Sequence, residues 1–137
     1  MEYTGVMMFD SLFKEKRRRE KVVRQADEKI AVLVRRRDDL DSARQMKLQR
    51  QVDLWSIPHL DSATEEEYFV VSRLIADLIK EIAAIDEYIS DLRQARYECV
   101  EAKKTEEIDR LLAIEDPWAE KIKLGTQDEV PRLAVLQ

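Results

Sequence analysis

The sequence predicts an all-α protein: a long antiparallel two-helix coiled-coil hairpin with a short, mostly irregular C-terminal tail. First, an apolar stripe steps by three and four residues without a slip from Tyr68 to Cys99, which is the heptad pattern of a helix packed along another helix. Second, the 137 residues include only 2 Gly and 3 Pro. Third, charged residues make up 39% of the chain and apolar residues 45%, a composition typical of long helices.

The first helix is expected over residues 10–54, after a short N-terminal lead at 1–9. Asp10 or Ser11 can cap its start, and neither Gly nor Pro follows before residue 55. Its heptad seam is weaker than the later one, because basic residues such as Arg37 and Arg44 occupy seam positions. The lead lacks the basic and apolar regions of a secretion signal, so we expect none.

The turn is expected at residues 55–62, because Pro58 disfavours a helix. Ser62 with Glu65, and Thr64 with Glu67, form two overlapping capping boxes that predict the start of the second helix. This helix is expected over 63–115, since Pro117 stops it. Residues 116–137 form the tail, which is apolar enough to dock on the hairpin, on another copy or on a partner.

Folding the chain near residue 61 predicts which side chains meet. Arg37 should lie near Asp86, and Arg96 near Asp27 or Glu28, as ion pairs that set the register of the seam. At the open end of the hairpin, one apolar group should meet another: Phe9, Leu12 and Phe13 opposite Ile108, Leu111 and Leu112. The loop between the helices is short enough to require antiparallel neighbours.

Charge is distributed unevenly. Residues 1–54 carry 14 Lys and Arg against 10 Asp and Glu, whereas residues 55–137 carry 10 against 19. Because exposed ion pairs contribute only about 0.2–1 kcal/mol each, we expect this asymmetry to favour the folded-back pairing rather than to stabilise it strongly.

The densest basic cluster lies near the start of the first helix and consists of Lys14, Lys16, Arg17, Arg18, Arg19, Lys21 and Arg24. Such a cluster could bind the phosphates of a nucleic acid, which gives the alternative function of a nucleic-acid-associated regulatory protein. However, three successive arginines point in three directions around a helix, and the net charge is −5. The other interpretation is a solvated helix surface beside the acidic second helix, so nucleic acid is not the expected partner.

Large aromatic residues near the ends and flanks of the seams are the candidate partner-binding residues, because such residues are favoured anchors in interfaces. We expect them to be exposed or half-exposed, although they could equally close off the ends of the seam. Arg96 joins them as part of a polar stretch of the seam that could recruit another chain. The set is Trp55, Tyr88, Arg96, Tyr97 and Trp118.

No catalytic or cofactor motif is present. The two glycines are far apart, which excludes a P-loop and a G-x-G-x-x-G loop, and His59 is the single histidine. We therefore expect no enzymatic activity, no cofactor and no metal. No apolar stretch approaches the length of a membrane span. The one cysteine, Cys99, lies at a seam position, which favours a buried thiol in a reducing compartment, so we expect a cytoplasmic location.

Three segments resemble the stalk proteins of bacterial type III secretion and flagellar export: Leu12 to Lys21, Thr64 to Tyr68, and Ile79 to Ile85. The resemblance covers about residues 12–112. It implies a hairpin similar to the rotor subunit of rotary ATPases, which inserts into a hexameric export ATPase and contacts an export gate or chaperones. The acidic net charge and the helix end at Pro117 differ from the usual family pattern.

Together these observations predict a non-enzymatic coiled-coil protein that acts as a structural or adaptor component of a larger assembly. The apolar seam is wider than the packing of two helices requires, since further apolar residues lie beside it: Phe13, Val34, Leu48, Ile79 and Val100. We therefore expect self-association or a protein partner, with the hexameric ATPase and a role in protein transport as the specific form that the resemblance implies.

Overall fold

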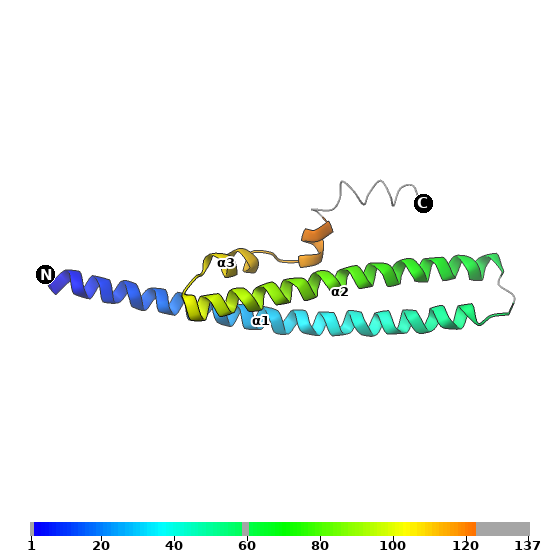
Figure 1. The fold of residues 1–137 in the computed structure, drawn as a ribbon, viewed down its shortest axis with the longest axis horizontal. Coiled ribbons are helices and arrows are strands. Elements are labelled where there is room, and N and C mark those ends of the chain that lie inside the picture. Colours follow the sequence, from blue (N-terminus) through cyan, green and yellow to red (C-terminus); the bar gives the residue numbers. More distant parts are fainter. Residues whose placement is uncertain (1, 59–60, 123–137) are drawn as a thin grey trace. The chain divides into compact units, whose positions relative to one another are not determined.

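The structure is a computed structural model, and it describes residues 2–58 and 61–122 of the chain. It confirms the all-α helical hairpin: α1 (Glu2–Trp55) and α2 (Ser62–Ala102) are long helices that pack against each other in opposite directions, and α3 (Glu106–Leu112) is short (Figure 1). The chain divides into two compact units. The first unit comprises residues 1–32 and 88–115, and the second unit comprises residues 33–87 and 116–137.

The helix boundaries at the turn agree closely with the sequence, but the cap differs. α1 ends at Trp55 and α2 begins at Ser62. Asp61, rather than Ser62 or Thr64, caps α2: its carboxylate accepts a hydrogen bond of 2.7 Å from the backbone N–H of Thr64. Hydrogen bonding to the Thr64 side chain, and then this backbone bond, lower the pKa of Asp61. Glu67 does not close a capping box, because it accepts a hydrogen bond from Arg50 instead.

In the first unit, α1 starts earlier than expected and extends beyond the end of α2 (Figure 1). The helix begins at Glu2 rather than at residue 10, and its side chains are described from residue 10 onward. Residues 10–18 are all exposed, although Arg18 at the end of this stretch forms an ion pair with Asp109 of α3. The side chain of Phe9 lies outside the described part.

The second long helix is shorter than predicted, because the chain reverses at Lys103. This residue has a φ of 56°, in the left-handed region that often terminates helices. The N–H of Lys104 then donates to the carbonyl of Glu98 at 3.3 Å, which satisfies one of the open carbonyls at the helix end. The single helix expected over 63–115 is therefore two helices, with α3 on the far side of this reversal.

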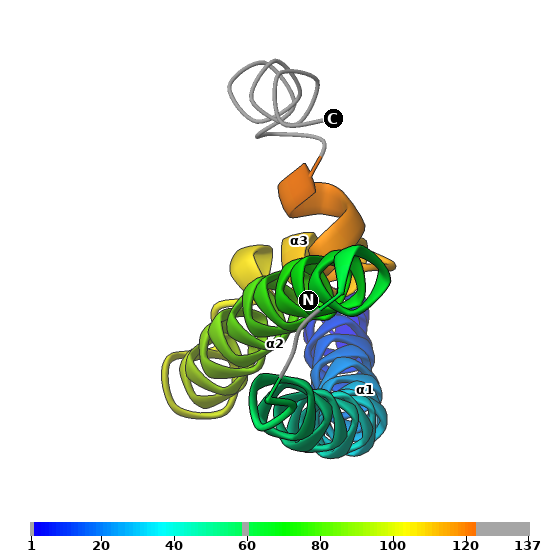
Figure 2. The same cartoon turned by 90° about the vertical axis from the view of Figure 1, so that its right-hand side faces the viewer.

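The reversal places α3 against one side of the α1–α2 pair in the first unit (Figure 2). Ile108 is 0% exposed and Leu111 is 2% exposed. Leu12 and Phe13, which were expected opposite them, are exposed, so that predicted pairing is wrong. The physical reason is the left-handed Lys103, which turns the apolar residues of α3 back onto the hairpin instead of extending α2.

The core of the second unit is a narrow strip. Leu54, Val71 and Ile75 form a buried cluster, with Tyr68 packed against it. Basic and polar residues of α1, such as Arg44 and Gln51, occupy much of the remaining seam. The seam of α1 therefore buries few apolar side chains here, as the sequence predicts.

The described part of the tail is more regular than predicted. Residues 117–122 are helical, and Asp116 caps them by accepting the N–H groups of Trp118 at 3.0 Å and Ala119 at 3.2 Å. Pro117 therefore starts a helical segment, since proline is favoured at the first helical position. It does not end the preceding helix as predicted, because α3 already ends at Leu112. Residues 123–137 lie outside the described residues.

Candidate partner-binding surface

Two ion pairs join α1 to α2, one in each unit. In the second unit Arg37 donates to Asp86 at 3.2 Å, and in the first unit Arg96 donates to Asp27 at 2.6 Å. Both pairs are those that folding near residue 61 predicts, so these predictions are confirmed. All four groups are partly exposed, and such pairs contribute little to stability. Their main effect is to oppose a slip between the helices.

Arg36 contacts two carboxylates within the second unit. Its guanidinium donates to Glu81 at 2.5 Å and also lies 3.6 Å from Asp116 of the tail. The hydrogen bond to Glu81 is the main reason that the pKa of Arg36 is raised. Lys121 of the same segment forms an ion pair with Glu87. The start of the tail is thus held on the hairpin by charge as well as by the buried Pro117.

Tyr88 is not available to a partner, contrary to the expectation from sequence. It is 5% exposed, and its hydroxyl donates to the carbonyl of Leu111 in α3. Burial raises the pKa of Tyr88 to about 12. The sequence suggested a flanking aromatic because Tyr88 sits beside the α2 seam, but α3 covers that flank in the first unit.

Lys29 completes this contact from α1. Its ammonium donates to the carbonyls of Leu112, at 3.5 Å, and Ile114, and lies 5.2 Å from the centre of the Tyr88 ring. A cation at carbonyls that end a helix is favoured by the helix dipole. Burial lowers the pKa of Lys29, and Glu115 partly opposes this change. Lys29 and Tyr88 thus join α3 to both long helices.

Sequence reasoning did not single out Lys29. Its position beside the seam of α1 is the one signal that could have found it, since a lysine there can reach a neighbouring element. Its partners are backbone carbonyls, however, and every residue has one, so the sequence does not indicate which carbonyl a lysine binds.

Trp55, Tyr68 and Phe69 form an aromatic cluster in the second unit, where the two long helices end and begin. The ring centroids of Trp55 and Tyr68 are 5.6 Å apart, and those of Tyr68 and Phe69 are 5.9 Å apart. Trp55 is 70% exposed and Phe69 is 57% exposed. Leu48 and Val52 continue the exposed apolar surface along α1 at helical spacing. Contiguous exposed apolar surface is one of the features by which interaction sites are recognised.

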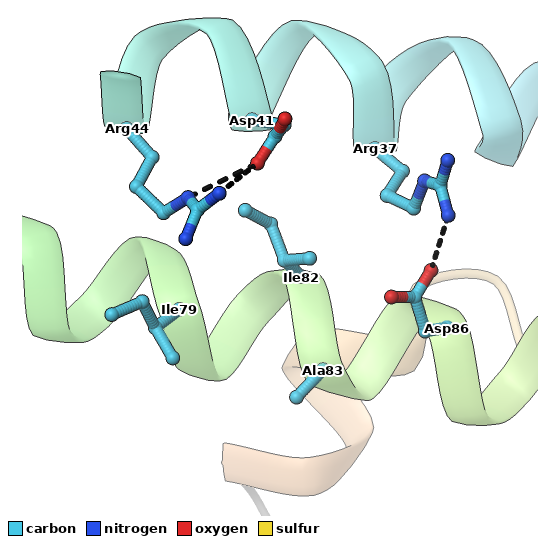
Figure 3. Close-up of a pocket in the computed structure, with 7 residues that line it drawn as sticks. All are labelled: Arg37, Asp41, Arg44, Ile79, Ile82, Ala83 and Asp86. Carbon is cyan, nitrogen blue, oxygen red and sulfur yellow. Dashed lines mark hydrogen bonds and ion pairs between the residues drawn. The ribbon is translucent and has the colours of Figure 1, made fainter. Parts of the chain in front are cut away.

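A cavity of about 430 Å³ lies between the long helices of the second unit. Ile79, Ile82 and Ala83 of α2 contribute apolar atoms, and the charged side chains around them are paired (Figure 3). Arg44 donates to Asp41 on its own helix at 2.6 Å, whereas Arg37 reaches across to Asp86 (Figure 3). The two positive and two negative side chains balance, so this cavity has no excess charge for a ligand to neutralise.

The basic cluster of α1 does not form a single patch. The guanidinium of Arg17 lies 4.4 Å from the centre of the Phe13 ring, and Arg18 forms an ion pair of 2.6 Å with Asp109 of α3. Lys16, Arg19 and Arg24 instead line a groove against the end of α2. Lys14 and Lys21 are exposed and do not line the groove. The divergence of the three arginines agrees with their positions on a helix.

The other candidate residues differ in exposure. Tyr97 is 61% exposed, and Trp118 is half-buried in the capped segment of the tail. Cys99 is 1% exposed, and burial raises the pKa of its thiol. The thiol is free.

Within residues 2–58 and 61–122, no helix has the combination of length and apolar character that crossing a membrane requires. The same described residues include no group of three or more His, Cys, Asp or Glu side chains placed to hold a metal ion, and His59 lies outside them. A comparison of the chain with protein-family models, with curated proteins and with solved structures finds no match.

Proposed function

We propose that the chain is a non-enzymatic coiled-coil interaction protein that serves as a structural or adaptor component of a larger protein assembly. The observation that carries this proposal is the aromatic cluster in which exposed Trp55 and Phe69 lie beside half-buried Tyr68, with the exposed apolar surface that continues from it. Exposed Trp and Tyr residues are common anchors of protein interfaces.

The specific form of the proposal is a secretion-apparatus stalk of the type III export kind, with a hexameric ATPase as partner and a cytoplasmic location. The resemblance of Leu12 to Lys21, Thr64 to Tyr68 and Ile79 to Ile85 to that family supports it. A hairpin of two long helices is also the fold that the resemblance implies. The buried free thiol of Cys99 suits a reducing compartment.

Site-specific photo-crosslinking in the native cells tests both levels of the proposal. A photoreactive phenylalanine analogue replaces Phe69 in one variant and Leu48 in another, and a matched control replaces Ser90, an exposed polar residue of α2. We expect the two apolar positions to yield the same protein adduct, identified by mass spectrometry, and the control to yield none.

The identity of the adduct separates the outcomes. A hexameric secretion ATPase or another export component supports the stalk form. A different protein, or a second copy of this chain, supports an assembly component but excludes the stalk. Equal adducts at all three positions, or none at any of them, contradict the interaction surface.

A further inference from the structure

A groove in the first unit combines positive charge with an apolar floor. It has a volume of about 540 Å³ and lies between α1 and the end of α2. Its lining consists of Lys16, Arg19, Glu20, Val23, Arg24, Cys99, Val100 and Lys103. Four positive groups therefore face one negative group.

None of these four cations forms an ion pair with another residue in the described part of the chain. This distinguishes them from Arg18, which binds Asp109, and from Arg96, which binds Asp27. It also distinguishes the groove from the cavity of the second unit, where each positive group lies near a carboxylate. Unpaired like charges repel one another, and an anionic ligand would relieve that repulsion.

The floor of the groove limits what that ligand can be. Val100 is 52% exposed, Val23 is half-buried, and Cys99 lies beneath them with its thiol shielded. No aromatic side chain is among the lining residues, so the groove lacks the aromatic platforms on which single-stranded nucleic acids commonly stack their bases. An aliphatic floor instead suits aliphatic side chains of a protein.

We propose that this groove binds an acidic amphipathic helix of a protein partner. Its carboxylates would lie between Lys16, Arg24 and Lys103, and its aliphatic side chains would cover Val23 and Val100. A groove between two roughly antiparallel helices accepts a third helix in the ordinary mode of helix-in-groove recognition. This inference names the partner chemistry for one surface of the interaction protein proposed above, and it rests on that function.

The test uses the full chain and a defined probe. A fluorescent helical peptide of about 20 residues, long enough to be helical in water, carries glutamates on both sides of a leucine stripe. A second peptide has lysines in place of the glutamates. Fluorescence anisotropy should show binding of the acidic peptide alone, and the affinity should fall steeply as salt rises, because exposed charges are screened.

The informative variant is the double substitution Lys16→Glu/Arg24→Glu. It should weaken binding of the acidic peptide by at least about tenfold, since it reverses two of the four charges that face the ligand. The matched control is Lys14→Glu/Lys21→Glu, which changes the same charge on the same helix at exposed positions outside the groove. The control should bind within about twofold of the unaltered chain, and circular dichroism should show equal helicity for both variants.

Three results would overturn the inference. The first is no binding of the acidic peptide. The second is an equal loss in both double variants, which would show a diffuse charge effect. The third is tighter binding of a single-stranded oligonucleotide or of vesicles of anionic lipid at the same salt. Crosslinking at Phe69 is independent of this groove, so failure here with retained crosslinks would leave the proposed function standing.

Discussion

The two units use the same pair of long helices, yet they bury apolar residues to different extents. In the first unit α3 covers one flank of the pair and buries Tyr88, Ile108 and Leu111. In the second unit large apolar residues stay exposed along both helices, including Leu48, Trp55, Phe69, Leu74 and Ile79. A two-helix seam alone cannot cover the width of its own apolar stripe. In the first unit α3 supplies a third element, whereas over most of the second unit the described chain supplies none.

The largest expected effect comes from one substitution made in each unit. Ile108→Ala should lower the free energy of unfolding by about 2–4 kcal/mol, because it empties a fully buried site. Ile79→Ala should change it by less than about 0.5 kcal/mol, since Ile79 is 49% exposed. Urea unfolding followed by circular dichroism measures both. Equal effects would show that the covered flank is no more stable than the open one.

Lys29→Met removes the ammonium that joins α1 to the carbonyls following α3. We expect a loss of about 1–2 kcal/mol, because a charge-assisted hydrogen bond disappears and the carbonyls lose a partner. Lys47→Met in the second unit is the control, since this half-buried lysine has no such bond. A loss in the control that matched that of Lys29→Met would contradict the assigned role.

Tyr88→Phe deletes only the hydroxyl that donates to Leu111. At neutral pH we expect a loss of about 1 kcal/mol. The pKa of Tyr88 is raised from 10.0 to about 12 in the folded chain, so its contribution is complete below the unfolded pKa and declines as pH rises through the folded pKa. The stability advantage of the unaltered chain over the variant should therefore shrink between pH 10 and about 12. A constant difference over that window would be inconsistent with a buried hydroxyl.

The smallest effect is a gain. Lys103→Gly should stabilise the first unit by about 0.5–1 kcal/mol, because glycine adopts a positive φ without the steric cost that a side chain incurs. Lys104→Gly, one residue on, should give no such gain. Thermal unfolding of the two variants compares them directly, and destabilisation by Lys103→Gly would argue against the left-handed reversal.

The heptad pattern predicted the features that depend on periodicity. The α2 seam from Val71 to Cys99 and the pairs Arg37–Asp86 and Arg96–Asp27 follow from spacing along the chain. The ends of the helices at the turn follow instead from Pro58 and the capping residues after it. These features are local or are dictated by one simple geometry, so a sequence contains the information they need.

The same pattern missed the end of α2, because no glycine or proline marks it. A lysine occupies the left-handed position at residue 103, and the apolar spacing resumes at Ile108 as if one helix continued. The reversal is favoured because it buries Ile108 and Leu111. It also brings the carbonyl of Leu111 to Tyr88 and that of Ile114 to Lys29. Such tertiary contacts override a local preference for a continuous helix. Tyr88 was misjudged for the same reason, since its cover comes from α3.

Because α3 has only seven residues, it has too few hydrogen bonds to be stable as an isolated helix. Its anchors are divided between Arg18 and Lys29 of α1 and Tyr88 of α2, so its binding surface exists only after those two helices have come together. We therefore expect the long pair to form first and α3 to dock last. By the same reasoning, α3 is the part that detaches most readily, and its amide protons should exchange with solvent before those of the seam at Ile89 and Leu92.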